Sequence, residues 1–124
     1  MRKRGHTLTT QELAIMKVVW DLGTPTVRDV YEALRAKRRI AYTTVMTMMN
    51  ILEGKGYLKK DTADRAYRYR PARARQAVVS SMVREFVNRV FDGASRPLLV
   101  HLVKAGRLDD RERKRLRQLI EEAD

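Results

Sequence analysis

Three threonines and an asparagine recur at helical spacing near the middle of the chain. Thr43, Thr44, Thr47 and Asn50 lie in the segment 40–54, interleaved with apolar residues three and four positions apart. In a helix, this spacing puts the polar side chains on one side and the apolar ones on the other. Short polar side chains can offer hydroxyl, amide and methyl contacts to base edges in a DNA major groove. The simpler alternative is a solvated helix face. The rest of the sequence is needed to decide between a DNA-contacting face and a solvated one.

The apolar side of the same segment predicts how the helix is held. Val45, Met48, Met49 and Leu52 form one stripe that should face a core, and Gly54 is predicted to end the helix. The segment 40–54 is therefore expected to be buried on one side and open on the other.

The charge of the chain favours a polyanionic partner. The 124 residues include 27 Lys and Arg against 15 Asp and Glu, a formal net charge of +12. Residues 1–71 carry +8 and residues 72–124 carry +4. Such an excess is typical of proteins that bind nucleic acid or an anionic membrane surface.

Several classes of protein are disfavoured by what the sequence lacks. It has no cysteine, so disulfides, thiolate chemistry and Cys-ligated zinc are excluded. No apolar run approaches the roughly 18 residues of a membrane span, and the basic start Met1 to Arg4 is not followed by a signal-peptide core. Since His6 and His101 are far apart and no catalytic constellation is visible, we expect no metal, no cofactor and no enzyme. His101 is interpreted as a partly buried helix residue, and the protein as cytoplasmic.

Two capped helices should precede the segment 40–54. Thr9 with Glu12 forms a capping box ahead of an apolar face that includes Trp20, and Gly23 ends that helix. Thr26 with Asp29 repeats the signal for a second helix. At this spacing Trp20 is interpreted as a core residue.

A basic hairpin is predicted after the segment 40–54. Residues 57–60 and 66–70 alternate in the manner of strands, residues 61–65 form the turn, and Pro71 is expected to end the ladder. Three helices followed by such a hairpin is the order of a winged helix-turn-helix domain, in which the third helix enters the major groove. We therefore predict a mainly α fold, with a winged helix-turn-helix domain at 1–71 and a β-hairpin as its wing.

Six segments in order resemble the penicillinase repressor family (BlaI, MecI and CopY). They are Leu8-Thr9 leading to Glu12, Val18-Val19-Trp20, Thr26-Val27-Arg28-Asp29-Val30, Ala41-Tyr42-Thr43-Thr44-Val45 with Thr47, Leu52-Glu53-Gly54-Lys55-Gly56-Tyr57-Leu58 and Arg65-Ala66-Tyr67-Arg68-Tyr69. The resemblance covers nearly the whole chain and implies a dimeric transcriptional repressor on a dyad-symmetric operator. The family often has Lys or Arg in the recognition helix, where this chain has Met46 and Ile51. The family's sequence preference is therefore not transferable.

Two sets of residues are predicted to contact DNA. The base-facing set is Tyr42, Thr43, Thr44, Met46, Thr47 and Asn50. The set expected on phosphates, from the linker before the third helix and from the wing, is Arg28, Arg38, Arg39, Lys59, Arg65 and Arg68.

Residues 72–124 are predicted to form a three-helix dimerisation region. Gly93 should end its first helix, Ser95 with Pro97 should start the second, and Asp109 with Glu112 should cap the third. An apolar seam this large on so few residues favours a second copy, although folding back onto the winged domain is the alternative. The seam comprises Val79, Met82, Val83, Phe86, Val87, Val90, Phe91, Leu98, Leu102, Leu116, Leu119 and Ile120.

The resemblance also implies a route of release. Antibiotic-responsive members are cut in the dimerisation region, commonly at an Asn-Phe bond, by a protease linked to a membrane sensor. Here His101 and Leu102 stand at that position. Either a protease of altered specificity cuts this bond, or it is not cut and another signal causes release.

The favoured function is a homodimeric DNA-binding repressor with its recognition helix in the major groove and its wing on the backbone. The alternative is a non-sequence-specific nucleoid or RNA-binding protein, and a basic protein on membrane surfaces is a third. A discrete palindromic footprint would separate the first from the others. The operator, the regulated genes and the inducing signal are not encoded in any motif.

Overall fold

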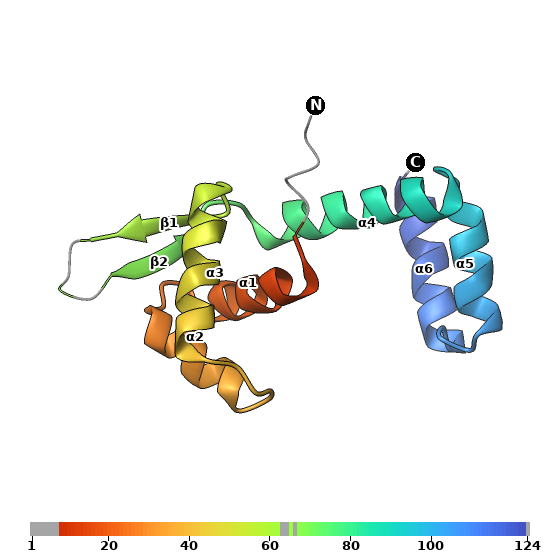
Figure 1. Cartoon of the computed structure of the whole chain (residues 1–124). Helices are drawn as coiled ribbons and strands as arrows, with labels where there is room; N and C mark the ends of the chain where they lie inside the picture. Colours follow the sequence, from red (N-terminus) through yellow and green to blue (C-terminus); the bar gives the residue numbers. More distant parts are fainter. Residues whose placement is uncertain (1–7, 63–64, 66, 124) are drawn as a thin grey trace. The chain divides into compact units, whose positions relative to one another are not determined.

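The computed structural model describes residues 8–62, 65 and 67–123, and its contacts divide the chain into two units, Met1–Met82 and Val83–Asp124. The first unit contains three helices, a two-stranded hairpin and the start of a fourth helix, and Figure 1 shows them along the chain. This is the winged helix-turn-helix architecture predicted from the sequence. The basic start of the chain, His6 and Ala66 lie outside the described residues.

Both predicted capping boxes are present. Helix α1, Thr10–Leu22, starts where the Glu12 amide donates to Thr9 Oγ1 at 3.1 Å and the Thr9 amide donates to Glu12 Oε1 at 2.9 Å. Helix α2, Val27–Arg35, has the same reciprocal pair between Thr26 and Asp29, at 3.1 and 3.0 Å. Each box satisfies two backbone amides that a helix start leaves without partners.

Helix α3, Tyr42–Gly54, follows with no side-chain cap at Ala41. The helix ends at Gly54, as predicted, but the residue beyond it that takes the left-handed conformation is Gly56, at φ 88°. The Tyr57 amide donates to the Leu52 carbonyl at 2.9 Å, and the Gly56 amide donates to the Glu53 carbonyl at 3.0 Å. This Schellman arrangement brings Tyr57 into the core beside the end of the helix.

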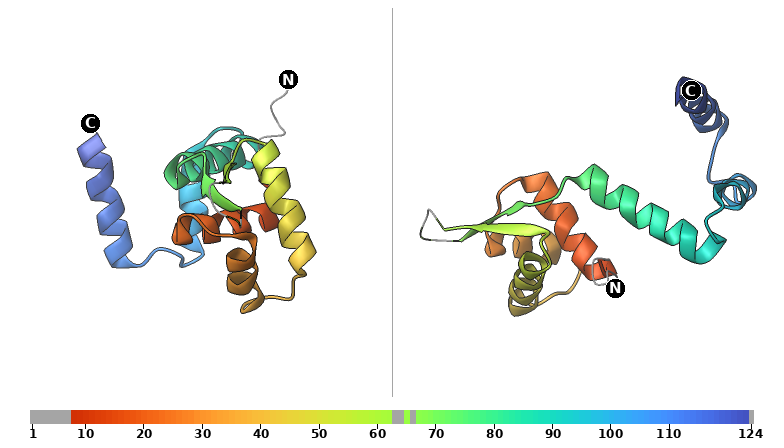
Figure 2. Two further views of the ribbon diagram at one scale, coloured as in Figure 1. Left: turned by 90° about the vertical axis from the view of Figure 1, so that its left-hand side faces the viewer. Right: turned by 90° about the horizontal axis from the view of Figure 1, so that it is seen from above.

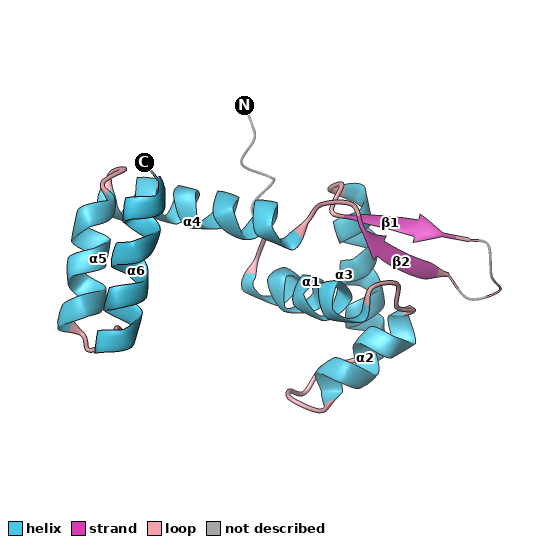
Figure 3. Ribbon diagram, turned by 180° about the vertical axis from the view of Figure 1, so that it is seen from behind, coloured by secondary structure: helices cyan, strands magenta, loops and turns pink. Residues whose placement is uncertain are grey.

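The hairpin is shorter and shifted relative to the prediction. Strand β1 is Leu58–Asp61 and β2 is Arg68–Pro71, antiparallel, with Leu58 opposite Pro71. Pro71 is therefore the last paired residue rather than the first residue after the ladder. In Figure 3 the hairpin is drawn in magenta.

A segment before α2 extends the hairpin on its other edge. The Tyr69 amide donates to the Pro25 carbonyl at 2.9 Å, and Thr26 forms an isolated antiparallel bridge with Arg68. These contacts join β2 to the start of α2.

One apolar core holds the helices and the hairpin together. The Trp20 indole N–H donates to the Arg73 carbonyl at 3.0 Å, while its ring packs against the core as predicted. Tyr69 of β2 belongs to this core and is 2% exposed. The largest fully buried side chains lie in α1, α2, α3, β1 and the segment before α2: Ile15, Met16, Val19, Pro25, Val30, Val45, Met49, Leu52 and Leu58.

Helix α4, Arg75–Phe91, begins as part of the winged domain. Val78 is buried in the core, Met82 packs against it, and Arg75 pairs with Asp21 at 3.6 Å. The contact boundary between Met82 and Val83 therefore lies eleven residues beyond the predicted one after Pro71.

The second unit contains the rest of α4 with α5, Ser95–Lys104, and α6, Asp110–Ala123. The predicted Asp109 and Glu112 pair caps α6 through bonds of 2.8 and 3.0 Å. Gly93 adopts φ 85° after α4, as its predicted role requires. Helix α5 starts at Ser95, as predicted, and its N-cap Ala94 makes no side-chain hydrogen bond. Figure 2 shows α5 and α6 as two helices joined by a loop, and neither has a buried residue among those described.

Candidate nucleic-acid interface

Helix α3 has the two faces that its sequence predicts. Val45, Met49 and Leu52 are fully buried, and Met48 packs against the core. On the opposite side, the predicted base-facing residues Thr43, Thr47 and Asn50 are exposed, while Thr44 is half-buried. The structure therefore leaves a surface of short polar side chains open along α3.

Tyr42 and Met46 flank this surface on the side of the hairpin. They are 37% and 39% exposed, large values for apolar side chains in a domain with a closed core. Both line a cleft of about 620 Å³ between α3, the start of α2 and the wing. The cleft is completed by Thr26, Val27, Arg28, Asn50, Lys60, Arg65, Tyr67 and Tyr69.

Asn50 is fixed by the wing. The Tyr69 hydroxyl donates to Asn50 Oδ1 at 3.1 Å, although the two residues are 19 positions apart. Tyr69 itself is buried, so this bond orients an exposed amide from a rigid base.

Several cations around the cleft already have partners within the chain. Arg28 lies 3.4 Å from Glu32 and 5.5 Å from the centre of the Tyr42 ring. Lys60 lies 3.7 Å from Glu53, and its Nζ is 4.8 Å from the centre of the Tyr67 ring. These contacts hold positive charge close to α3 and next to aromatic faces.

Arg68 is a structural residue as much as a surface cation. Its Nη1 donates to the Thr24 carbonyl at 3.0 Å and the residue is half-buried. A change at Arg68 would therefore disturb the junction between the wing and α2 as well as the surface charge.

The register of the hairpin identifies a basic residue that the sequence analysis missed. Lys59 and Arg70 face each other directly across the strands, and both are exposed. Like charges in directly opposite positions destabilise a strand pair. An anion such as a phosphate, bound between them, would remove that repulsion. Arg70 could have been found from the alternation of β2, but only if the register with Lys59 were known.

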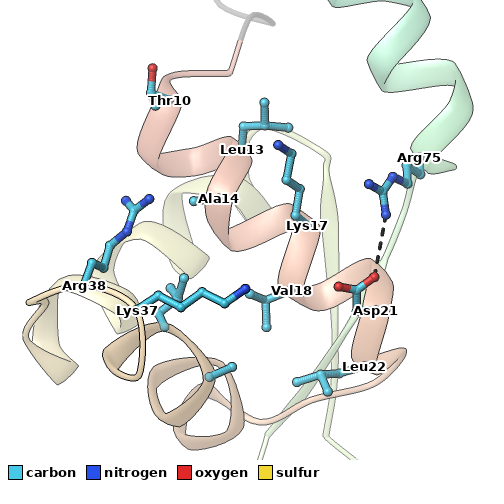
Figure 4. A pocket seen from close by; sticks show the side chains of 12 residues that line it. Thr10, Leu13, Ala14, Lys17, Val18, Asp21, Leu22, Lys37, Arg38 and Arg75 are labelled. Carbon is cyan, nitrogen blue, oxygen red and sulfur yellow. Dashed lines mark ion pairs between the residues drawn. The ribbon is translucent and has the colours of Figure 1, made fainter.

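The linker before α3 carries Lys37, Arg38 and Arg39, all exposed. Figure 4 shows Lys37 and Arg38 at the rim of a separate groove between α1 and α2. This groove, of about 470 Å³, has an apolar floor that includes Leu13 and Val18. Arg38 is therefore shared between the linker and this second surface, whereas Arg39 is not among the residues that line the groove.

A buried ion pair fixes the end of α3 to the start of α1. Lys55 Nζ donates to Glu12 Oε1 and Oε2 at 3.1 and 3.0 Å, and Glu12 is 4% exposed. Burial by itself would raise the pKa of Glu12, but the bonds from the Thr9 amide and Lys55 and the charge of Lys55 outweigh it. The pKa of the carboxyl is lowered as a result.

Neither a metal site nor a membrane-spanning helix is found among the described residues. They contain no group of three His, Asp or Glu side chains placed to hold a metal ion, and none of their helices is long and apolar enough to cross a bilayer. The expectation that His101 is partly buried was wrong, since it is exposed on α5.

Solved structures of similar sequence share the architecture of the winged domain. The DNA-binding domain of the repressor BlaI superposes with a TM-score of 0.52 at 26% identity, covering 60% of this chain and 90% of that one. The monomeric form of Bacillus licheniformis BlaI, solved in complex with the blaP half-operator, gives 0.51 at 26% identity, covering 56% and 85%.

Sequence comparisons extend the similarity beyond that domain. The transcriptional regulator BlaI of Mycobacterium tuberculosis is 40% identical over 95 residues, which cover 75% of this chain and 69% of that protein. The penicillinase repressor of Bacillus licheniformis is 24% identical over 120 residues, 97% of this chain and 94% of that one. The family model described as penicillinase repressor matches residues 8–122. With a match across almost its whole length and a winged domain of the same architecture, this chain belongs to the penicillinase repressor family.

Proposed function

We propose that the protein is a transcriptional repressor that binds operator DNA with α3 in the major groove and the hairpin on the backbone. The observation that carries this proposal is the uncharged outer face of α3, with exposed cations on the linker before it and on the wing after it. Such an arrangement puts hydrogen-bonding and methyl groups at base edges and positive charge at phosphates. A related BlaI has been solved in complex with a half-operator, which supports operator DNA as the partner.

The proposal separates residues that contact bases from residues that contact phosphates. Arg68 contributes to the structure of the wing through its bond to Thr24. Arg70, which lies opposite Lys59, replaces Arg68 as a phosphate contact of the wing. The base-facing residues are Tyr42, Thr43, Thr44, Met46, Thr47 and Asn50, and the phosphate contacts come from Arg28, Arg38, Arg39, Lys59, Arg65 and Arg70.

The functional form in this proposal is a homodimer on a dyad-symmetric operator. Of the apolar residues predicted for the seam, Val79, Val83, Phe86, Val90, Leu119 and Ile120 are between 39% and 57% exposed. Met82 stabilises the winged domain instead, because it packs against the core of that domain. Apolar side chains left open in this number mark an association surface, and a second copy is the simplest occupant.

The activity in this proposal is binding rather than catalysis, in the cytoplasm where the chromosome lies. Release by a protease linked to a membrane sensor is one open route. His101 is exposed on α5 and Leu102 is half-buried, so a protease would need local opening of the helix to reach the bond between them.

The alternative, non-specific coating of nucleic acid, predicts different responses to two substitutions. Thr47→Ala should weaken operator binding by about 1–3 kcal/mol and leave binding to random DNA unchanged, because Thr47 contributes only to base contacts. Arg70→Ala should weaken both and lower the slope of log affinity against log salt by about 1.

Both variants can be compared by fluorescence anisotropy on footprinted and scrambled duplexes. Thr10→Ala, at an exposed threonine of α1, is the matched control and should change neither affinity. Equal losses for Thr47→Ala on the two duplexes would favour the non-specific alternative.

A further inference from the structure

The outer face of α3 lacks the side chains that make the strongest base contacts. From Ile40 to Leu52 the sequence contains no Lys, Arg, Asp or Glu. Guanine is most often recognised by Arg or Lys, and cytosine by Asp or Glu. Glu53, the next residue, is occupied by Lys60 at 3.7 Å. Direct recognition of a G·C pair by charged groups is therefore not available to this helix.

Two of the cations near α3 are already held by other groups. Lys55 is held by the buried carboxylate of Glu12 at 3.0 Å. Arg28 is held between Glu32 and the ring of Tyr42. Moving either to a base edge would break these contacts, and for Lys55 it would leave a buried carboxylate unpaired.

Adenine recognition is restricted by the wing. An asparagine that recognises adenine uses its amide oxygen and its NH2 group together. In this chain the Asn50 oxygen already accepts the Tyr69 hydroxyl at 3.1 Å, which fixes the amide. The NH2 group keeps both of its N–H donors for an acceptor such as thymine O4, whereas Oδ1 has one lone pair left.

Beside its short polar residues, α3 also exposes apolar side chains. Ile51 is 44% exposed, Met46 39% and Tyr42 37%, whereas the aliphatic side chains of Val45, Met49 and Leu52 face the core. The γ-methyl groups of Thr43 and Thr47 add to this surface. The C5-methyl group of thymine is the apolar group that base pairs present in the major groove.

We propose that α3 recognises its half-site through thymine C5-methyl groups, with Met46 and Ile51 each contacting one methyl. This inference rests on the function proposed above. The two side chains lie about 140° apart around the helix and about 7.5 Å apart along it. That axial distance is close to the rise of two base pairs, about 6.8 Å. Met46 and Ile51 therefore contact different base pairs, on either side of the polar centre formed by Thr47 and Asn50.

The test replaces thymine with uracil, which pairs identically but lacks the methyl group. A binding site is first selected from duplexes with a randomised 20-base-pair core, using the full chain. Each thymine of the selected site is then changed to uracil in turn. We expect at least two positions at which affinity falls about fourfold, the effect of withdrawing one buried methyl-sized group.

Variants assign each methyl to its side chain. Met46→Ala should abolish the thymine preference at one position and keep it at the other, and Ile51→Ala should do the reverse. Arg70→Ala is the control, because it should weaken thymine and uracil duplexes by the same factor. A 5-methylcytosine at a Met46 or Ile51 position should bind more tightly than cytosine there.

The outcomes separate this inference from the proposed function. Equal affinity for thymine and uracil at every position would overturn methyl recognition while leaving sequence-specific binding intact. The same conclusion would follow if the uracil effect persisted unchanged in both variants. Failure to select any sequence would overturn the proposed function itself.

Discussion

Neutralising Glu12 should destabilise the winged domain far more than its single hydrogen bond to a capping amide suggests. In Glu12→Gln the side-chain oxygen can still accept from Thr9, but the amide NH2 faces the ammonium of Lys55. Removing one member of a buried ion pair costs about 3–5 kcal/mol. Because the Lys55 side chain is 29% exposed, water can solvate part of its charge. We therefore expect a loss of about 1–3 kcal/mol at pH 7 and a fall in Tm of roughly 10 °C.

The effect should depend on pH with a definite sign. Since the pKa of Glu12 is lowered in the folded chain, its contribution is complete above the carboxyl pKa of the unfolded chain, about 4.3. The contribution is lost as pH falls through the lower folded value. Protonated Glu12 is a neutral side chain like Gln, so the two proteins should converge in stability in acid.

Urea unfolding followed by circular dichroism at pH 7 and at several acidic pH values measures both effects. Glu32→Gln is the matched control, because Glu32 pairs with Arg28 and Arg35 on the surface and its side chain is 50% exposed. That change should cost less than about 1 kcal/mol. A difference between wild type and Glu12→Gln that stayed constant into acid, or that matched the control, would refute the role assigned to the ion pair.

Three further outcomes are expected. A fragment ending at Met82 should be a folded monomer with weak operator affinity, whereas one ending at Pro71 should melt at a lower temperature because it lacks Val78. Sedimentation measures the oligomeric state of both fragments, and thermal melting measures their stability. A dimeric 1–82 fragment would contradict the assignment of dimerisation to the second unit. Phe86→Glu should weaken dimerisation by at least tenfold through burial of a charge, about 1.4 kcal/mol or more, and unchanged sedimentation would exclude Phe86 from the interface. Mass spectrometry of the protein after antibiotic treatment of its host should show either an intact chain or a fragment ending at His101, and the fragment would exclude the branch without cleavage.

Local chemistry made much of the winged domain predictable. The capping boxes at Thr9 and Thr26 each need only residues three positions apart, so sequence spacing specifies them. The two faces of α3 follow from its 3.6-residue period for the same reason. The resemblance to the family was confirmed, since the family model matches residues 8–122.

Choices that depend on packing were beyond the sequence. Gly54 is the last helical residue, whereas the left-handed turn at Gly56 depends on the position of Tyr57 in the core. The strand register that opposes Lys59 to Arg70 depends on the turn and on the burial of Tyr69.

The sequence by itself determined which elements form and which face of each is apolar, because helix caps and periodicity are local properties. Only the tertiary structure decided which polar groups are already occupied. The Lys55 contact with Glu12 spans 43 residues and the Tyr69 contact with Asn50 spans 19. No local pattern encodes such pairs, since they exist only when the core brings distant segments within hydrogen-bonding distance.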